Sequence, residues 1–425
     1  MTNTPTVWLG GSAATGRSYT DLTAPGTNWF SATGASVLKV YSADLLYAPA
    51  AELQQMFAFL KANGIKLAVE AYLVTAGPGQ SGEGLASPTD TAAMVARVQA
   101  LGGTIDYVQM DEALYRGSVV YGMPLSELAA NVAANVATIR TAFPAVQIGD
   151  IEPFPLADSV SQIQAWLQAY QTATGTPLDS FTPDLAWSSA NWRSQLENLS
   201  GMLQSHGVGL SVIFHGNSND GSNAQWGQTA DQIMAAVLSD PRIKIQTSII
   251  QTWQAYPTVA TPDNVPGAMS NVALTASTLA SFYEGGLLGY ATSLSFTAPI
   301  QLSLPSGSNL FGIAVGIGAV DQEAHSNLAI MITSGSLLLA ADQIGSGLVE
   351  GSGTTQLLLF GNAADINAEL ATLRASGVVG SSDQVNVAIF DRTGILADRQ
   401  ISVTVTGGGG ASDSATADNL SFPDV

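Results

Sequence analysis

Ile105-Asp106-Tyr107-Val108-Gln109-Met110-Asp111-Glu112 is a short, largely apolar stretch that ends abruptly in two acidic residues. Val146-Gln147-Ile148-Gly149-Asp150-Ile151-Glu152-Pro153, further along the chain, has the same form. Short apolar runs of this kind indicate buried strands of a parallel sheet, because helices cover both faces of such a sheet. Carboxylates are tolerated where a strand emerges at its carboxyl end. Two acid-tipped strands therefore predict an active site at the carboxyl ends of a parallel sheet.

Residues 1–290 are predicted to alternate between strands and amphipathic helices. The predicted strands are 6–9, 37–41, 65–70, 105–112, 146–153, 181–187, 210–214 and 245–251, and the predicted helices are 51–62, 88–101, 124–143, 159–170, 192–206, 229–238 and 274–283. Successive strand and helix units of this kind favour a closed (β/α)8 TIM barrel, an α/β fold, over an open sheet. No glycine-rich Rossmann or phosphate-loop motif lies at a strand-to-helix turn, which argues against a doubly wound sheet.

After residue 290, helical periodicity gives way to short β-rich runs between Gly and Ser turns. Residues 291–406 are predicted to form an all-β sandwich, with strands at 311–315, 328–332, 335–339, 355–360, 385–390 and 401–405. Segments 334–337, 353–361 and 387–394, with a helical insert at 364–373, resemble the cadherin-like, immunoglobulin-like modules of large bacterial surface and secreted proteins. Residues 407–425, rich in Gly, Ser, Ala and Asp, are predicted to be a flexible tail.

Glu112 and Glu152 close the two acid-tipped strands and are the predicted catalytic pair. A glycosidic bond is broken by two carboxyl groups, one protonated to donate to the leaving oxygen and one ionised as nucleophile or base. Side chains alternate along a strand, so Asp150 and Glu152 share one orientation. The alternative interpretation is that these acids cap the following helices or pair with Arg116, a role that suits Asp111 or Asp150.

Polar and aromatic side chains near the other strand ends are predicted to bind the substrate. Aromatic faces stack on sugar rings, and amides and carboxylates bond to sugar hydroxyls, so this mixture suits a carbohydrate better than an apolar ligand. The predicted supporting and substrate-binding residues are Lys39, Tyr41, Glu70, Tyr72, Asp111, Asp150, Asp184, Trp187, His215, Asn217, Gln251, Trp253 and Tyr256. Each alone could serve packing, and Lys39 and Glu70 could equally form a buried ion pair inside the barrel.

The first part of the chain resembles TIM-barrel glycoside hydrolases, and more closely a group of uncharacterised secreted bacterial proteins. The resemblance rests on the segments Met110-Asp111-Glu112, 147–153 and Gln251-Thr252-Trp253-Gln254-Ala255-Tyr256-Pro257-Thr258. In the large retaining clan of these enzymes, one glutamate closes strand four as acid/base and another closes strand seven as nucleophile. Glu112 matches the first position, but strand seven ends in Phe214-His215-Gly216-Asn217, without a carboxylate. Glu152 would then have to supply the second carboxylate, or the enzyme would be inverting or substrate-assisted.

A metal-dependent hydrolase is the weaker alternative, because the sequence has no HExxH-like spacing. No cofactor is therefore predicted to be required for catalysis. The side chains that could converge on a divalent hydrolase metal are those of Glu70, Asp111, Asp150, Asp184 and His215. The candidate ligands for a structural calcium ion in the β-rich part are Asp321, Glu323, Asp383 and Asp391.

The charge balance excludes several classes of partner. Lys and Arg total 13 against 33 Asp and Glu, a formal net charge of -20, which argues against binding a phosphate backbone. No apolar run is long enough to span a membrane. Cysteine is absent, so disulfides, thiolate nucleophiles and Cys-ligated zinc are excluded.

The cellular location is predicted from composition. The first residues lack the basic and apolar regions of an N-terminal signal peptide. The Lys-poor, acidic composition nonetheless favours an extracellular or cell-surface protein, with an acidic cytoplasmic protein as the alternative.

The leading functional prediction is a secreted glycoside hydrolase acting on an oligo- or polysaccharide. Its rivals are a non-catalytic carbohydrate-binding or adhesin-like surface protein and the metal-dependent hydrolase.

Overall fold

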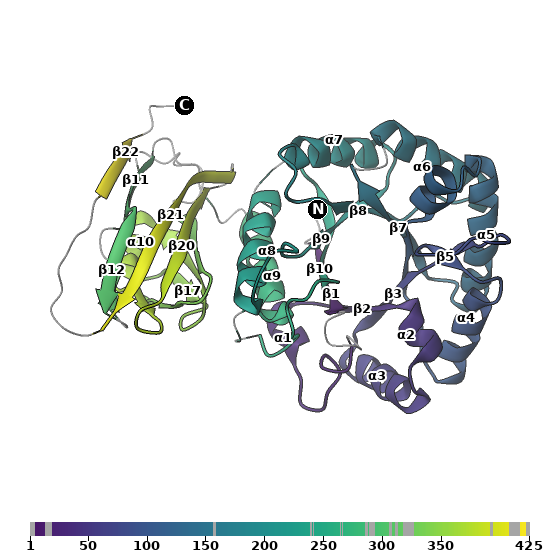
Figure 1. The fold of residues 1–425 in the computed structure, drawn as a ribbon, viewed down its shortest axis with the longest axis horizontal. Helices are drawn as coiled ribbons and strands as arrows, with labels where there is room; N and C mark the ends of the chain where they lie inside the picture. The colour runs from purple at the N-terminus through teal and green to yellow at the C-terminus, as the bar shows by residue number, and fades with distance from the viewer. Residues whose placement is uncertain are drawn as a thin grey trace. The chain divides into compact units, whose positions relative to one another are not determined.

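The computed structural model describes residues 5–12, 19–155, 159–238, 240, 242–263, 265, 267–284, 288, 294–305, 308–310, 313–317, 327–391, 394–407 and 417–421. Contacts between residues divide the chain into two compact units, shown in Figure 1. The barrel unit comprises residues 5–217 and 242–261, and the sheet unit is formed by 218–241 and 262–425. The domain boundary expected near residue 290 stays a prediction.

Eight parallel strands close into a barrel in the barrel unit, which confirms the predicted TIM-barrel fold (Figure 1). Around the barrel the strands run in the order β1, β10, β9, β8, β7, β6, β3, β2, and β2 closes on β1. Their bounds are β1 Thr6–Ser12, β2 Val37–Tyr41, β3 Lys66–Ala71, β6 Tyr107–Asp111, β7 Gln147–Phe154, β8 Ser180–Leu185, β9 Gly209–Phe214 and β10 Ile245–Thr252. Every predicted strand of this part of the chain corresponds to one of them.

Helices surround the strands of this unit (Figure 1). The long ones are α3 Ala50–Asn63, α4 Asp90–Ala100, α5 Leu125–Ala142, α6 Val160–Thr174 and α7 Trp192–Ser205, all of them predicted. The elements that were not predicted are α1 Trp29–Thr33, α2 Ser42–Tyr47, the π-helix η2 Tyr115–Val120 and the paired strands β4 Val74–Thr75 and β5 Leu85–Ala86. These elements are too short to show a periodic pattern in the sequence.

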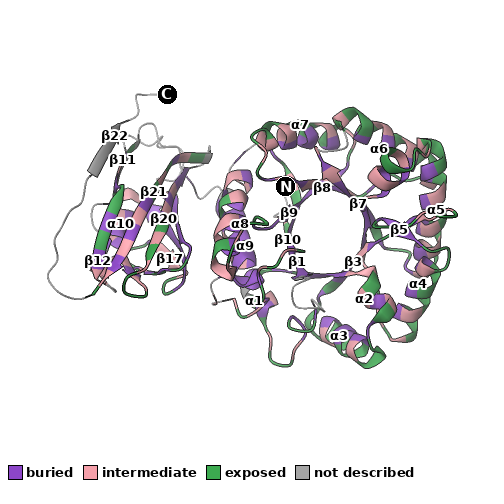
Figure 2. Cartoon of the chain, in the orientation of Figure 1, coloured by how far each residue is buried: buried purple, intermediate pink, exposed green. Residues whose placement is uncertain are grey.

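One apolar cluster identifies the side chains that face the barrel interior. Trp8, Val37, Ala68, Ile151, Ile213 and Ile249 pack together although they come from six different strands. Only the inside of a closed barrel brings such side chains together. Alternation then turns Lys39, Glu70 and Asp111 inward as well, while Asp150 and Glu152 turn outward. Figure 2 shows the strands largely buried.

The sheet unit has a mixed six-stranded sheet in the order β12, β21, β20, β15, β18, β17, and two three-stranded sheets, β14-β11-β22 and β13-β19-β16. The strands are β11 Leu294–Pro299, β12 Gln301–Pro305, β13 Ser308–Asn309, β14 Ala314–Ile317, β15 Asn327–Ser334, β16 Leu338–Ala340, β17 Leu348–Glu350, β18 Gln356–Asn362, β19 Arg374–Ser376, β20 Ser382–Asp391, β21 Gly394–Thr406 and β22 Ala417–Ser421. Helix α10, Ala363–Leu370, is the predicted insert. The cadherin-like character of this unit stays a prediction.

Both faces of the six-stranded sheet are covered by apolar side chains. Leu328 and Ile330 of β15 point into the core shared with the other sheets. Ala329 and Met331 alternate with these residues and lie on the other face of the sheet. They pack against helices α8, Asn223–Leu238, and α9, Met269–Glu284. Phe282 of α9 also stacks on Phe360 with ring centroids 4.3 Å apart. The continuous apolar run of β15 therefore reflects a strand buried on both sides.

One prediction for this part of the chain needs correction, and the calcium site stays a prediction. Residues 417–421 are not a flexible tail but form β22, which pairs with β11, whereas 408–416 and 422–425 lie outside the described residues. Asp383, a candidate calcium ligand, accepts hydrogen bonds from the backbone N–H groups of Gly335, Ser336 and Leu337 and so caps that turn. Asp391 is buried, and Asp321 and Glu323 lie outside the described residues.

Asp231 of α8 is an acid buried among apolar side chains in the sheet unit. It is 1% exposed, and its Oδ1 atom has no hydrogen-bond partner among the described residues. Burial raises the pKa of Asp231 well above its usual range, and a hydrogen bond with Gln356 opposes this only in part. The folded protein therefore holds the Asp231 proton more tightly than the unfolded chain does.

Asp231→Asn should remove part of the pH dependence of folding stability. Because the pKa is raised in the folded state, the wild type should lose stability as pH rises from the unfolded value, about 3.9, towards the folded pKa. Asn cannot ionise, so its advantage over Asp should grow by up to about 1.4 kcal/mol per pH unit in that window. Urea unfolding between pH 4 and 8 measures this difference. A constant difference across the range would contradict the buried, protonated Asp231.

Candidate active site

Four polar side chains form a hydrogen-bonded network at the carboxyl ends of β2, β3 and β10. Lys39 is 1% exposed, forms an ion pair with Glu70 and donates to Gln251. The Gln251 amide donates to Tyr41 Oη at 2.8 Å and to Glu70 Oε2 at 3.2 Å. The buried Lys39–Glu70 pair that the sequence allowed is thus present. It places a buried ion pair at one side of the barrel mouth.

Asp111 and Asp184 bring two further carboxyl groups to the mouth. Asp111 ends β6, and Asp184 lies on β8, two residues after Thr182, whose hydroxyl donates to the inward-facing Gln109. Burial, followed by the charges of Glu70, Glu83 and Glu112, raises the pKa of Asp111 well above its usual range. Burial, followed by the charges of Glu112 and Glu70, raises the pKa of Asp184 to about 6. Both carboxyl groups therefore favour protonation more than an ordinary aspartate does.

Glu112 lies at the point where β6 leaves the barrel. Its φ is +50°, in the left-handed region that side chains other than Gly seldom adopt. Its Oε2 accepts from Arg116 Nε at 2.6 Å, which is the ion pair allowed by the sequence. Burial raises the pKa of Glu112, and Arg116 opposes that rise. Strained backbone of this kind clusters at functional sites, so the outlier supports a role for Glu112.

A loop packs tightly against this strand end. A Cβ atom on Gly84 would lie 2.9 Å from both the Asp111 carbonyl oxygen and Arg116 Cγ, and Gly84 has a φ of +77°. Only glycine therefore fits there. The preceding residue, Glu83, forms a second ion pair with Arg116 at 3.3 Å. Glu83 was not predicted from the sequence, because the loop carries no pattern that points to the end of β6.

Glu152 is fully buried and faces out of the barrel. Its Oε1 accepts from the backbone N–H of Leu114 at 2.6 Å, and its Oε2 accepts from that of Tyr115 at 2.9 Å. These amides begin the turn that carries Arg116. This geometry favours a positioning role for Glu152, which holds the segment after Glu112, over the catalytic role predicted from the sequence.

Asp150 also faces outward, towards helix α6. It is fully buried, and its Oδ2 accepts from Trp166 Nε1 at 2.6 Å. Asp150 therefore lies on the outer face of β7, away from the barrel interior, and its supporting role in the site stays a prediction. In the described part of the chain, no group of three or more His, Asp or Glu side chains is placed to hold a metal ion.

Aromatic side chains gather after β8, β9 and β10. Trp187, His215 and Trp253 form a chain of ring contacts, with centroids 6.3 Å apart for the first pair and 4.7 Å for the second. Burial lowers the pKa of His215, and its Nδ1 donates to the Gly216 carbonyl oxygen at 2.6 Å. His215 Nε2 is thus a neutral acceptor, buried without a partner among the described residues.

The remaining predicted residues lie at the edges of the site. Asn217 is exposed after β9, Tyr256 is half-buried after β10, and Tyr72 follows β3. Burial, followed by the charges of Asp111 and Glu83, raises the pKa of Tyr72 to about 12. Tyr72 therefore stands beside the carboxyl cluster. The mouth as a whole combines carboxyl groups of raised pKa with aromatic rings and one neutral imidazole, a combination suited to acid/base work on a polar substrate.

No protein-family model matches the sequence, and no curated protein matches it. Similar solved structures include an endo-1,4-beta-xylanase from Caldicellulosiruptor owensensis, at 9% identity and a TM-score of 0.39 over 59% of this chain and 85% of the xylanase. A D-psicose 3-epimerase has 10% identity and a TM-score of 0.36 over 65% of this chain and 98% of its own.

A 3-deoxy-D-arabino-heptulosonate 7-phosphate synthase from Thermotoga maritima has 8% identity and a TM-score of 0.40 over 66% of this chain and 87% of its own. These likenesses extend to enzymes of different activities. The assignment of the fold rests on the closed barrel itself. In the described residues, no helix is long and apolar enough to cross a membrane. The chain is thus an α/β TIM barrel with a separate, mixed-sheet C-terminal part.

Proposed function

We propose that the barrel is a glycoside hydrolase that cleaves O-glycosyl bonds of an oligo- or polysaccharide. The observation that carries the proposal is the different surroundings of two carboxyl groups at the mouth, one buried with a raised pKa and the other paired with an arginine. Asp184 has its pKa raised to about 6, and Glu112 is the neighbouring charge that raises it most. Burial raises the pKa of Glu112 as well, but Glu112 is bonded to Arg116, which favours its ionised form. A carboxyl group that retains its proton and a second one whose ionised form an arginine stabilises are what glycoside hydrolysis requires.

In this proposal Asp184 is the general acid and Glu112 is its ionised partner. Protonated Asp184 donates to the leaving glycosidic oxygen, and Glu112 acts as nucleophile or base on the other side of the sugar ring. Asp111 and Glu70 bond to sugar hydroxyls between them. Glu152 takes no part in the chemistry and instead fixes the segment that follows Glu112.

The experiment that tests the function is a screen of oligosaccharides by mass spectrometry. Wild type should release shorter products from at least one oligosaccharide, and Asp184→Asn should release them at least about 10²-fold more slowly. Binding without product formation by the wild type would overturn the hydrolase proposal. It would favour a non-catalytic carbohydrate-binding surface protein instead.

The secreted location remains part of the proposal. It is supported by the acidic, Lys-poor composition and a net charge of -20. A large net negative charge favours solubility and disfavours binding to nucleic acid. Detection of the chain in the medium of the cells that produce it would test this. A strictly intracellular pool would contradict it.

Arg116→Gln should shift the acidic limb of the pH profile of kcat/KM to higher pH. Arg116 lowers the pKa of Glu112 through its hydrogen bond and its charge, so its removal raises that pKa and protonates Glu112 at higher pH. The acidic limb of kcat/KM reports the group that must be ionised, and it should shift towards neutral pH. Arg140→Gln, which removes an exposed bond to Thr176, serves as the control. An unchanged acidic limb would exclude Glu112 as the ionised group.

A further inference from the structure

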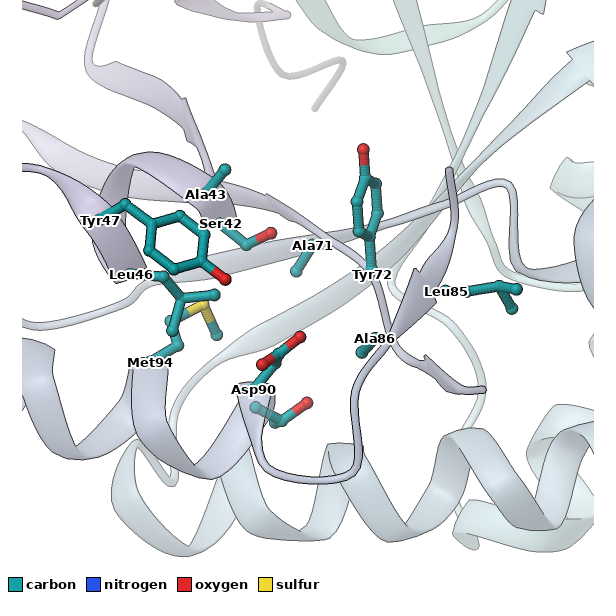
Figure 3. A pocket seen from close by; sticks show the side chains of 11 residues that line it. Ser42, Ala43, Leu46, Tyr47, Ala71, Tyr72, Leu85, Ala86, Asp90 and Met94 are labelled. Carbon is teal, nitrogen blue, oxygen red and sulfur yellow. The ribbon is translucent and has the colours of Figure 1, made fainter. Parts of the chain in front are cut away.

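A small pocket lies beside the barrel mouth, next to the end of β3. Its volume is about 190 Å³, and it is lined from α2, the segment after β3, β5 and the start of α4. Figure 3 shows Tyr47 on one side, Tyr72 and Leu85 on the other, and the carboxylate of Asp90 directed towards the space between them. Apart from Tyr72, the sequence pattern pointed to none of these residues.

The lining combines aromatic and aliphatic walls with polar groups at one end. Tyr47, Tyr72 and Met94 provide apolar surface. Asp90 accepts hydrogen bonds from the backbone N–H of Ser87 at 2.9 Å and from the Ser87 hydroxyl at 2.5 Å, one on each carboxylate oxygen. Each oxygen has a second acceptor site, so the carboxylate can also accept from a ligand hydroxyl. This distribution matches a sugar ring, which has apolar faces and a hydroxyl-bearing edge.

Thr91 provides an independent sign of a ligand. It lines the pocket, is 5% exposed, and its hydroxyl has no hydrogen-bond partner among the described residues. Other helical threonines of this unit, such as Thr138 and Thr172, donate to the carbonyl four residues earlier. A buried hydroxyl without a partner is costly and rare in proteins. A ligand hydroxyl in the pocket would satisfy it.

Tyr72 connects this pocket with the carboxyl cluster. It lines the pocket, and the charges of Asp111, Glu83, Glu70 and Glu112 act on its hydroxyl. The volume lies below the roughly 300–1,000 Å³ of sites that hold a drug-sized ligand, so it suits a single ring. We propose that the pocket binds one sugar unit of a glycan whose neighbouring linkage lies at the mouth. This inference rests on the proposed function and predicts that an oligosaccharide is a better substrate than a monosaccharide glycoside.

Tyr47→Ala tests the pocket without disturbing the core, because Tyr47 is 77% exposed and lies outside the carboxyl cluster. The probes are cellohexaose, xylohexaose and laminarihexaose, with aryl monosaccharide glycosides for comparison. Loss of the aromatic wall should raise the Kd and KM for the hexaose that binds best by about tenfold, equivalent to about 1.4 kcal/mol. The kcat and KM for the aryl monosaccharide glycoside should not change.

Thr91 provides a second test with a matched control. Thr91→Val keeps the shape and removes the hydroxyl, and it should weaken hexaose binding about threefold to tenfold. Thr91→Ser keeps the hydroxyl and should bind nearly as wild type does. Equal affinities for all three proteins would overturn the proposal.

Calorimetric binding separates this proposal from the proposed function. If wild type binds a hexaose without cleaving it and Tyr47→Ala weakens that binding, the pocket proposal is supported and the hydrolase proposal is wrong. If wild type cleaves a hexaose and Tyr47→Ala leaves Kd and KM unchanged, the hydrolase proposal is supported and the pocket proposal is wrong. If no hexaose binds to the wild type, both proposals are contradicted.

Discussion

Asp184→Asn should lower kcat for glycan hydrolysis by about 10²- to 10⁴-fold, the usual contribution of a positioned general acid. Asn has nearly the shape of Asp and can still bond to a sugar hydroxyl, so KM should change far less than kcat. The new amide occupies the same space at the end of β8, and the variant should therefore fold. The change in kcat then measures the lost proton rather than lost structure.

The pH profile of the wild type checks the same assignment. Asp184 must be protonated to act, and its pKa is raised to about 6, so kcat/KM should fall as pH rises through about 6. Glu197→Gln on α7, which removes an ion pair with Arg242, is a matched carboxylate-to-amide control and should leave kcat unchanged. An alkaline limb well above this pH, or an Asp184→Asn variant with full activity, would show that another residue is the general acid.

The strands of the barrel could be predicted from the sequence because each is short, is largely buried and contains apolar residues that no helical spacing explains. β2 was located to the residue, and β7 and β10 to within one residue at each end. Burial of β15 on both faces likewise produces a continuous apolar run, 328–332, that needs no knowledge of its neighbours. These signals are local, so a single sequence carries them.

The orientation of side chains at the mouth was harder to predict. The sequence shows that Asp150 and Glu152 share a face of β7, but not whether that face looks into the barrel. Ile151, between them, packs with the interior cluster and so turns both acids outward. Asp184 was recognised only as a supporting residue, because its raised pKa depends on burial and on charges from other strands. Such non-local effects leave no pattern in the surrounding residues.

Glu112→Gln and Glu152→Gln make the same chemical change in two glutamates that end similar stretches of sequence. The first should lower kcat, and the second should lower the stability of the fold. In Glu112→Gln the amide oxygen can still accept from Arg116 but the side chain carries no charge, so kcat should fall by about 10²- to 10⁴-fold while stability changes little. Glu152→Gln leaves one oxygen for two buried backbone N–H donors, so the amide NH₂ group must face one of them. That loss should lower the free energy of unfolding by about 1–3 kcal/mol.

Both variants can be compared by urea unfolding and by kcat measured well below the unfolding transition. Because Glu152 orders the turn that carries Arg116, any fall in kcat for Glu152→Gln should come with an altered acidic limb of the pH profile, as in Arg116→Gln. If Glu152→Gln instead lowered kcat by about 10²-fold or more, with the stability and the pH profile of the remaining activity unchanged, Glu152 would be the nucleophile or base. The carboxyl pair would then be Glu112 and Glu152, and the outward orientation of Glu152 would have to change when substrate binds.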